Sequence, residues 1–308
     1  QTSPSPAMIF ASQSLFKEVT SAVGVKYVHT QTDFVDFNIQ KLLPHKFSEY
    51  NPAIAVGDIN GDGIDDMVVG GSSNQSAQLF IQDKQNRFTQ KALLTGINNN
   101  KPNSDQGILL IDVDADNDLD LLVTSGGYEQ KAKDSAYLDQ LYLNDGKANF
   151  TLDKNALPLN TTSKLCIRGA DFDKDGDSDF IFASTSYTEE HKSIYVIENK
   201  GNNNWALFKK LPGFIWPRKG VLADVDKNGY LDFIVADQGY DYPPYPGAEI
   251  GIVYFFKDRV EVKVIPNSLA YNHTISAADI DNDGDVDVFN WRNTYTNFAN
   301  KLPSMPIM

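Results

Sequence analysis

Residues 58–66, with the sequence DINGDGIDD, decide the fold of this chain, because four further versions of the stretch follow. All five share the pattern D-x-[DN]-x-[DN]-[GN]-x-x-D, which places oxygen-bearing side chains at positions 1, 3, 5 and 9. The other copies are residues 112–120 (DVDADNDLD), 171–179 (DFDKDGDSD), 224–232 (DVDKNGYLD) and 279–287 (DIDNDGDVD). An acidic nonapeptide that recurs five times indicates a repeat whose units share one loop.

The spacing of these oxygens matches the needs of a hard divalent cation. Calcium takes about six to eight oxygen ligands at about 2.3–2.6 Å in a tolerant geometry. Alternate residues of a tight turn can direct side chains at one point, position 7 can add its backbone carbonyl, and Gly or Asn at position 6 permits a positive φ. We therefore predict about five Ca²⁺ sites. Their predicted ligands are Asp58, Asn60, Asp62, Ile64 and Asp66; Asp112, Asp114, Asp116, Asp118 and Asp120; Asp171, Asp173, Asp175, Asp177 and Asp179; Asp224, Asp226, Asn228, Tyr230 and Asp232; and Asp279, Asp281, Asp283, Asp285 and Asp287.

These loops differ from an EF-hand in two ways. The Glu that an EF-hand carries at position 12 is absent, and Val69, Val123 and Phe182 stand there in the first three copies. An apolar strand pattern, rather than a helix, follows each loop. A solvated acidic turn would explain one such stretch, but five copies in register favour a metal-binding repeat.

The period of the repeat predicts an all-β propeller. The copies start at residues 58, 112, 171, 224 and 279, and each unit contains four short strand patterns with the acidic loop between the first and second. A period of this length made of strands and turns indicates one four-stranded antiparallel sheet, or blade, per repeat. We expect five blades in one domain that spans residues 1–308. Its expected parts are a flexible leader (1–7), outer strands that complete the last blade (8–23), a crossing segment or cap (24–50), and the repeats 51–105, 106–164, 165–218, 219–272 and 273–308.

Charge and composition narrow the class of protein. The formal net charge is −14, and five bound Ca²⁺ ions would bring it to −4. This acidity argues against nucleic acid as a partner, because phosphates need a basic surface. No stretch approaches the ~20 apolar residues of a membrane-spanning helix. The polar leader is typical of a segment that follows a processed N-terminus or a lipid-anchor site, so we expect an extracytoplasmic protein, either secreted or at the cell surface.

A second periodic feature lies at the other end of the strands. A tyrosine stands eight residues after the last Asp of four loops, between the second and third strands. Such residues could stack on sugar rings or anchor a protein partner, and the alternative is that each packs on the neighbouring blade. The residues of this predicted ligand face are Tyr128, Tyr187, Tyr240 and Tyr295, with Tyr242 and Tyr245 in the Tyr/Pro-rich loop 238–248.

Catalytic motifs do not emerge from the sequence. The histidines His29, His45, His191 and His273 are scattered, and Cys166, the single cysteine, lies in an apolar strand pattern typical of a buried thiol. Most paired carboxylates belong to the loops, where a bound cation would keep them ionised and unsuited to proton transfer. The sequence favours a protein that is not an enzyme over one that is.

Through its acidic loops, its repeat period and its strand pattern, the chain resembles the FG-GAP/VCBS repeat family, to which integrin α heads belong. It is most similar to secreted VCBS-repeat proteins of Bacteroidetes, related to cartilage-acidic-protein-type propellers, through residues 34–37, 42–45, 55–58 and 141–146. The resemblance implies calcium in the loops and a role in adhesion, glycan binding or protein assembly. The alternatives are a polysaccharide lyase or hydrolase on a propeller scaffold, and a subunit of an outer-membrane surface complex.

Two departures from the family pattern affect these expectations. Asn60 and Asn228 replace carboxylates, which predicts weaker cation binding in the first and fourth loops. FG-GAP propellers usually have seven blades, so the chain could also be a fragment of a seven-bladed propeller.

Overall fold

The protein is all-β in the computed structural model, which describes residues 16–39, 41, 46, 48, 52–94, 101–154, 156–185, 193–201, 204–240 and 247–293. Among these residues, the only helical segments are the 3-10 turns η1 (Asp36–Asn38) and η2 (Ser135–Tyr137). No helix in this part of the chain has the length and apolar character needed to span a lipid bilayer.

Four complete sheets follow the order of the chain, and every pairing in them is antiparallel. This confirms the predicted pattern of four antiparallel strands per repeat. The strands are β1 (Ile54–Gly57), β2 (Asp66–Val69), β3 (Gln78–Gln82) and β4 (Phe88–Ala92); β5 (Ser104–Ile111), β6 (Asp120–Gly126), β7 (Gln140–Leu143) and β8 (Thr151–Asp153); β9 (Ser163–Ala170), β10 (Asp179–Thr185), β11 (Ser193–Asn199) and β12 (Trp205–Pro212); and β13 (Pro217–Ala223), β14 (Asp232–Asp237), β15 (Gly251–Phe256) and β16 (Arg259–Val264).

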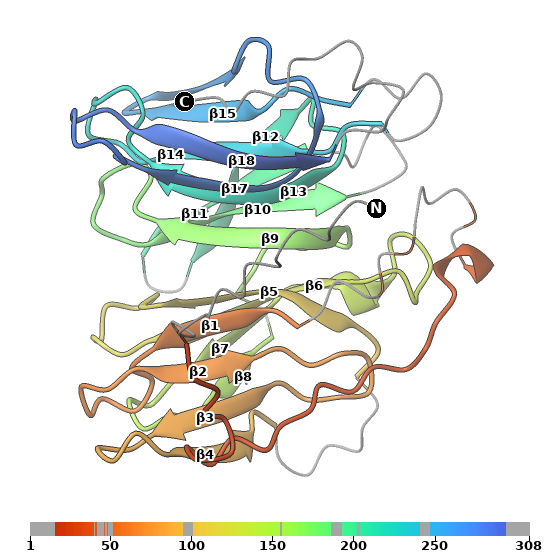
Figure 1. Ribbon diagram of the computed structural model, residues 1–308, viewed down its shortest axis with the longest axis vertical. Helices are drawn as coiled ribbons and strands as arrows, with labels where there is room; N and C mark the ends of the chain where they lie inside the picture. Colours follow the sequence, from red (N-terminus) through yellow and green to blue (C-terminus); the bar gives the residue numbers. More distant parts are fainter. Residues whose placement is uncertain are drawn as a thin grey trace, which may run out of the picture.

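The fifth sheet contains two strands in the described part of the chain, β17 (Tyr271–Ala278) and β18 (Asp287–Asn293). Figure 1 shows β1–β4 at one end of the molecule, β9 near the middle, and β13–β15 together with β17–β18 toward the other end. The first strands β1, β5, β9, β13 and β17 are neighbours in that order, and one cavity is lined by residues from all five. The sheets are therefore propeller-like blades around a common axis, but within the described residues they do not close into a ring.

The core consists of apolar layers between successive sheets. The residue at position 2 of the first three acidic loops packs into the layer shared with the next sheet: Ile59, Val113 and Phe172 are all buried. The Phe172 ring stacks on Phe255 of β15, with 4.4 Å between the ring centroids. The equivalent Ile280 of the fifth loop is 66% exposed. The position-2 side chain thus joins one blade to the next.

Burial on both faces explains the composition of the second strands. Every residue of β6 and β14 is buried, because each sheet is covered by a neighbouring sheet on both sides. Their sequences read as continuous apolar runs rather than alternating patterns, as expected for strands without a solvent face. The outer strand β12 is mostly exposed between its buried ends, Trp205 and Leu211.

The described residues show where parts of the expected leader-side segments and repeats lie. Residues 16–23, the described part of the segment expected to complete the last blade, form no strand; the carbonyl of Val23 accepts a hydrogen bond from the Phe88 amide of β4. This part therefore lies beside the first sheet. The Tyr27 ring contacts Phe80 of β3, so the start of the expected cap 24–50 also follows the first sheet. Strands β5, β9, β13 and β17 each begin two residues before the expected repeat boundary.

Candidate calcium-binding loops

The five acidic loops fold in the same way, held by hydrogen bonds between their own residues. In each loop the carboxylate at position 1 accepts the backbone N–H of position 6 across the turn. The side chain at position 5 accepts the N–H of position 7. The first set of bonds is Gly63 to Asp58 (2.8 Å), Asn117 to Asp112 (3.1 Å), Gly176 to Asp171 (3.1 Å), Gly229 to Asp224 (2.8 Å) and Gly284 to Asp279 (3.0 Å). The second set is Ile64 to Asp62, Asp118 to Asp116, Asp177 to Asp175, Tyr230 to Asn228 and Asp285 to Asp283.

The backbone turns through the left-handed region twice in every loop, at positions 4 and 6. The positive φ expected at position 6 is confirmed, whereas position 4 was not anticipated. Position 4 is Gly61 in the first loop but a residue with a side chain in the other four, for example Ala115 with φ 62°. A side chain in this conformation costs about 1–2 kcal/mol. These four loops therefore hold strain that glycine would avoid.

The carboxylates at positions 1, 3 and 9 converge in four of the loops. In each, one oxygen from every member of the triad lies within 4.8 Å of the others. Two ligands on one Ca²⁺ ion at about 2.3–2.6 Å can be no more than about 5 Å apart, so this spacing fits a shared cation. The triads are Asp112, Asp114 and Asp120; Asp171, Asp173 and Asp179; Asp224, Asp226 and Asp232; and Asp279, Asp281 and Asp287. In the first loop Asn60 stands where the others have the second Asp.

The electrostatics of the loops also fit a cation. Burial, followed by repulsion from the other loop carboxylates, raises the pKa of Asp118 to about 6. Burial raises the pKa of Asp179 to about 7, although it accepts two backbone hydrogen bonds. One oxygen of Asp118 and one of Asp224 are buried without a hydrogen-bond partner in the described part of the chain. A divalent cation would supply both the missing partner and the missing positive charge.

The Asp at position 9 has a second role that the sequence did not reveal. One oxygen accepts the N–H of position 2 in its own loop, and the other accepts an N–H of the third strand. For Asp179 these donors are Phe172 (2.9 Å) and Asn199 (2.8 Å). The same pair of bonds is made by Asp66 to Ile59 and Gln82, by Asp120 to Val113 and Asn144, and by Asp232 to Val225 and Phe255. Position 9 therefore fixes each of these loops to its own sheet, in addition to offering a ligand.

Two asparagines link the loops of successive blades. The side-chain amide of Asn144, at the end of β7, donates to the carbonyl of Ile59 in the first loop at 2.9 Å. Asn199, at the end of β11, donates to the carbonyl of Val113 in the second loop at 3.0 Å. The signal was present in the sequence as an Asn directly after the apolar run of the third strand, in LYLN and VIEN.

Lysines at position 4 make further contacts between loops. The ammonium of Lys174 lies over the ring of Tyr230 in the next loop, 4.2 Å from its centroid. Lys227 pairs with Asp285, at position 7 of the fifth loop. The backbone carbonyls of Ile64 and Tyr230 remain predicted ligands.

The predicted ligand face is only partly described by the structure. Tyr128 is 1% exposed and packs with Trp216 in a small buried cluster, so it is a core residue and not a surface for ligands. This corrects the prediction for Tyr128 and follows the alternative of packing between blades. Tyr240 is half-buried, and its backbone pairs with Gly247. Tyr187, Tyr242, Tyr245 and Tyr295 lie outside the described residues.

Comparison with known proteins assigns the repeats. The model of the family described as "FG-GAP-like repeat" matches residues 58–123, 112–182 and 171–235. A solved structure with a partly similar trace is the V. cholerae biofilm matrix protein Bap1, at 13% sequence identity and a TM-score of 0.32. The alignment covers 78% of this chain and 66% of that one, so the chain spans about two thirds of its length. The three family matches together cover residues 58–235, which is more than half of the chain, and the protein therefore belongs to the FG-GAP-like repeat family.

Proposed function

We propose that this protein is a calcium-stabilised extracellular module that binds a glycan or protein partner without catalysis. The observation that carries the proposal is the repeated carboxylate triad, which four loops hold with the same spacing. Membership of the FG-GAP-like family supports calcium as the cation and the extracellular side of a membrane as the location.

Calcium would act on this protein through stability and shape. If each site has a Kd of ~0.1 mM and free calcium is ~2 mM, binding contributes ~1.8 kcal/mol per site. Several such sites together would rival the net stability of an ordinary domain, ~5–15 kcal/mol. Sites of this strength would fill outside cells and stay nearly empty at cytosolic calcium levels.

The two ends of the sheets would have different roles, cation binding at one end and partner contact at the other. The acidic loops join first and second strands at one end, and the connections between second and third strands leave from the other. Cations at the first end would hold the blades in register. The loops at the second end, which include Tyr240, would present the contact surface on a rigid scaffold.

A polysaccharide lyase or hydrolase is the alternative from another class. It would be favoured by a central pocket in which a Lys, Arg or Tyr meets carboxylates from outside the acidic loops. The central cavity is lined by Arg168, Arg218 and Lys219, and among the described residues that line it there is no Asp or Glu. This lining favours a binding role over acid–base hydrolysis.

The test is a glycan-array and pull-down screen performed with and without EGTA. We expect captured partners in calcium that are lost with EGTA and restored when calcium is added back. The same protein should be incubated with acidic polysaccharides while the absorbance of unsaturated products is followed. Partner binding unaffected by EGTA would refute the calcium-dependent module, and unsaturated products would replace it with a lyase.

A further inference from the structure

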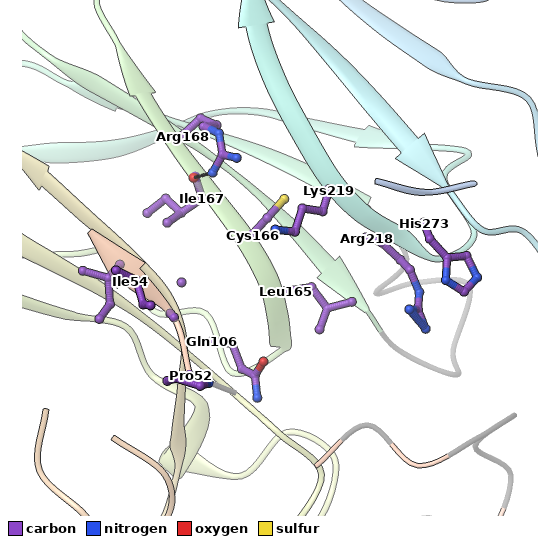
Figure 2. A pocket seen from close by; sticks show the side chains of 13 residues that line it. Pro52, Ile54, Gln106, Leu165, Cys166, Ile167, Arg168, Arg218, Lys219 and His273 are labelled. Atoms are coloured by element: carbon purple, nitrogen blue, oxygen red, sulfur yellow. Dashed lines mark hydrogen bonds between the residues drawn. The ribbon is translucent and has the colours of Figure 1, made fainter. Parts of the chain in front are cut away.

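The central cavity is a concavity separate from the acidic loops. Its volume is about 530 Å³, and it is lined by residues from all five first strands. Figure 2 shows these side chains gathered around one space from separate strands. A volume of this size lies within the range of about 300–1,000 Å³ that is usual for small-molecule sites.

The strand registers place the cavity away from the acidic loops. Gln106 lies near the start of β5, whereas the second loop follows the end of that strand at Asp112. Ser104, at the start of β5, pairs with Gly126, where β6 ends and the connection to the third strand leaves. The lining residues stand three to six positions before the first Asp of the following loop, so the cavity lies along the middle of the first strands and is distinct from the loops.

The cavity is basic, in a protein with a net charge of −14. Among the described residues, the cations that line it are Arg168, Arg218 and Lys219, with His273 beside them, and none of these lining residues carries a carboxylate. Within the described part of the chain, neither Arg168 nor Lys219 makes an ion pair; one Nη of Arg168 donates to the Ile167 carbonyl at 2.7 Å. Cations grouped in a cavity with low-dielectric walls concentrate the positive potential there and attract anions.

The cavity also offers neutral hydrogen-bonding groups and apolar walls. Gln106 is 8% exposed, and its side-chain nitrogen has no hydrogen-bond partner in the described part of the chain. Apolar surface comes from Ile54, Ile108 and Ile167. A saccharide carries both hydroxyl groups and C–H faces, so it matches this mixture better than an inorganic anion does.

We infer that the central cavity binds the carboxylate of a short acidic saccharide, with Arg168 and Lys219 as the charged contacts. A short ligand is favoured because the acidic exterior of the protein repels a long polyanion, whereas one or two charges can enter the basic cavity. This inference rests on the proposed binding function and names the class of ligand for one site.

The experiment is a titration of the full chain in saturating calcium with galacturonic acid and with galactose, followed by ligand-observed NMR. We expect the acid to bind and the neutral sugar to bind at least about tenfold more weakly, because only the acid can form charge-assisted hydrogen bonds. Lys219→Gln and Arg168→Gln should each weaken binding of the acid by at least about tenfold. Added salt should weaken it as well.

The matched control is Lys209→Gln, which removes the same charge from an exposed position on the outer strand β12 and should leave binding unchanged. Calcium-dependent melting of each variant separates a local effect from misfolding. Equal binding of galacturonic acid and galactose, or an equal loss in Lys209→Gln, would overturn the inference. Tighter binding of a glutamate-containing peptide would replace the saccharide with an acidic peptide. If calcium-dependent melting is intact, any of these outcomes would contradict the saccharide inference without contradicting the proposed calcium-stabilised module.

Discussion

The side-chain amide of Asn199 in the third sheet donates a hydrogen bond of 3.0 Å to the backbone carbonyl of Val113 in the second acidic loop. The two residues are 86 positions apart, and Asn199 is almost fully buried. Its backbone N–H meanwhile donates to Asp179 of its own repeat. One asparagine thus joins two acidic loops in successive blades.

The first prediction concerns this link. Asn199→Ala should lower the free energy of unfolding by about 1–3 kcal/mol, because the buried Val113 carbonyl would lose its hydrogen-bond partner. The control is Asn149→Ala, which removes an exposed side-chain bond to Asp145 and should cost less than about 0.5 kcal/mol. Urea denaturation in saturating calcium measures both. Equal effects of the two substitutions would show that the link between blades contributes little.

The second prediction separates the two roles of position 9. Asp179→Ala should destabilise the protein even in EGTA, by about 2–5 kcal/mol, since two buried N–H groups lose their acceptor. Asp175→Ala, at exposed position 5, removes one exposed bond within the loop and should act mainly on the stabilisation that calcium provides. Thermal melts of each variant with calcium and with EGTA distinguish the structural role of position 9 from its role in calcium binding. A chelated Asp179→Ala protein that melts with the wild type would contradict the structural role.

The third prediction concerns backbone strain. Ala115→Gly should raise the free energy of unfolding by about 0.5–1 kcal/mol, because φ is 62° at this position and glycine adopts that conformation without steric cost. Ala132→Gly provides the comparison, since Ala132 is an exposed turn residue without a positive φ. That substitution should lower stability by about 0.4–1 kcal/mol. Effects of the same sign at both positions would rule out strain at position 4.

The fourth prediction is that acid weakens the effect of calcium. The pKa values of Asp118 and Asp120 are raised to about 6 and that of Asp179 to about 7, mainly by burial. A carboxyl whose pKa is raised in the folded protein stabilises the fold when protonated, and that contribution disappears as the pH rises through the raised pKa. These groups should therefore stabilise the chelated protein in acid, whereas calcium requires their ionised forms.

The measurement is the difference in melting temperature between calcium-loaded and chelated protein at several pH values. This difference should shrink as the pH falls from about 8 to about 5. Asp120→Asn, which removes one of these titrating groups, should flatten the dependence. A difference that stays constant across this range would contradict the predicted competition between protons and calcium.

Much of the fold was readable from the sequence because its signals are local. The turn of each acidic loop depends on hydrogen bonds between residues at most seven positions apart, such as Gly63 to Asp58 and Ile59 to Asp66, so nine residues suffice to specify it. The strands that flank the loops follow from short apolar runs, and the repeat period follows from counting. The four-stranded antiparallel blades and the FG-GAP-like family were therefore predicted correctly.

Tertiary structure decided what depends on distant segments. Tyr128 occupies a loop position that the pattern left open, but Trp216, 88 residues later, buries it. The basic cavity forms only because Arg168 and Lys219, which no motif connects, lie on neighbouring first strands that line the same cavity. The sequence by itself determined the loops and the blades, since their hydrogen bonds are short in range. Burial and the convergence of charge depend on how whole blades pack against one another, and no local pattern encodes that packing.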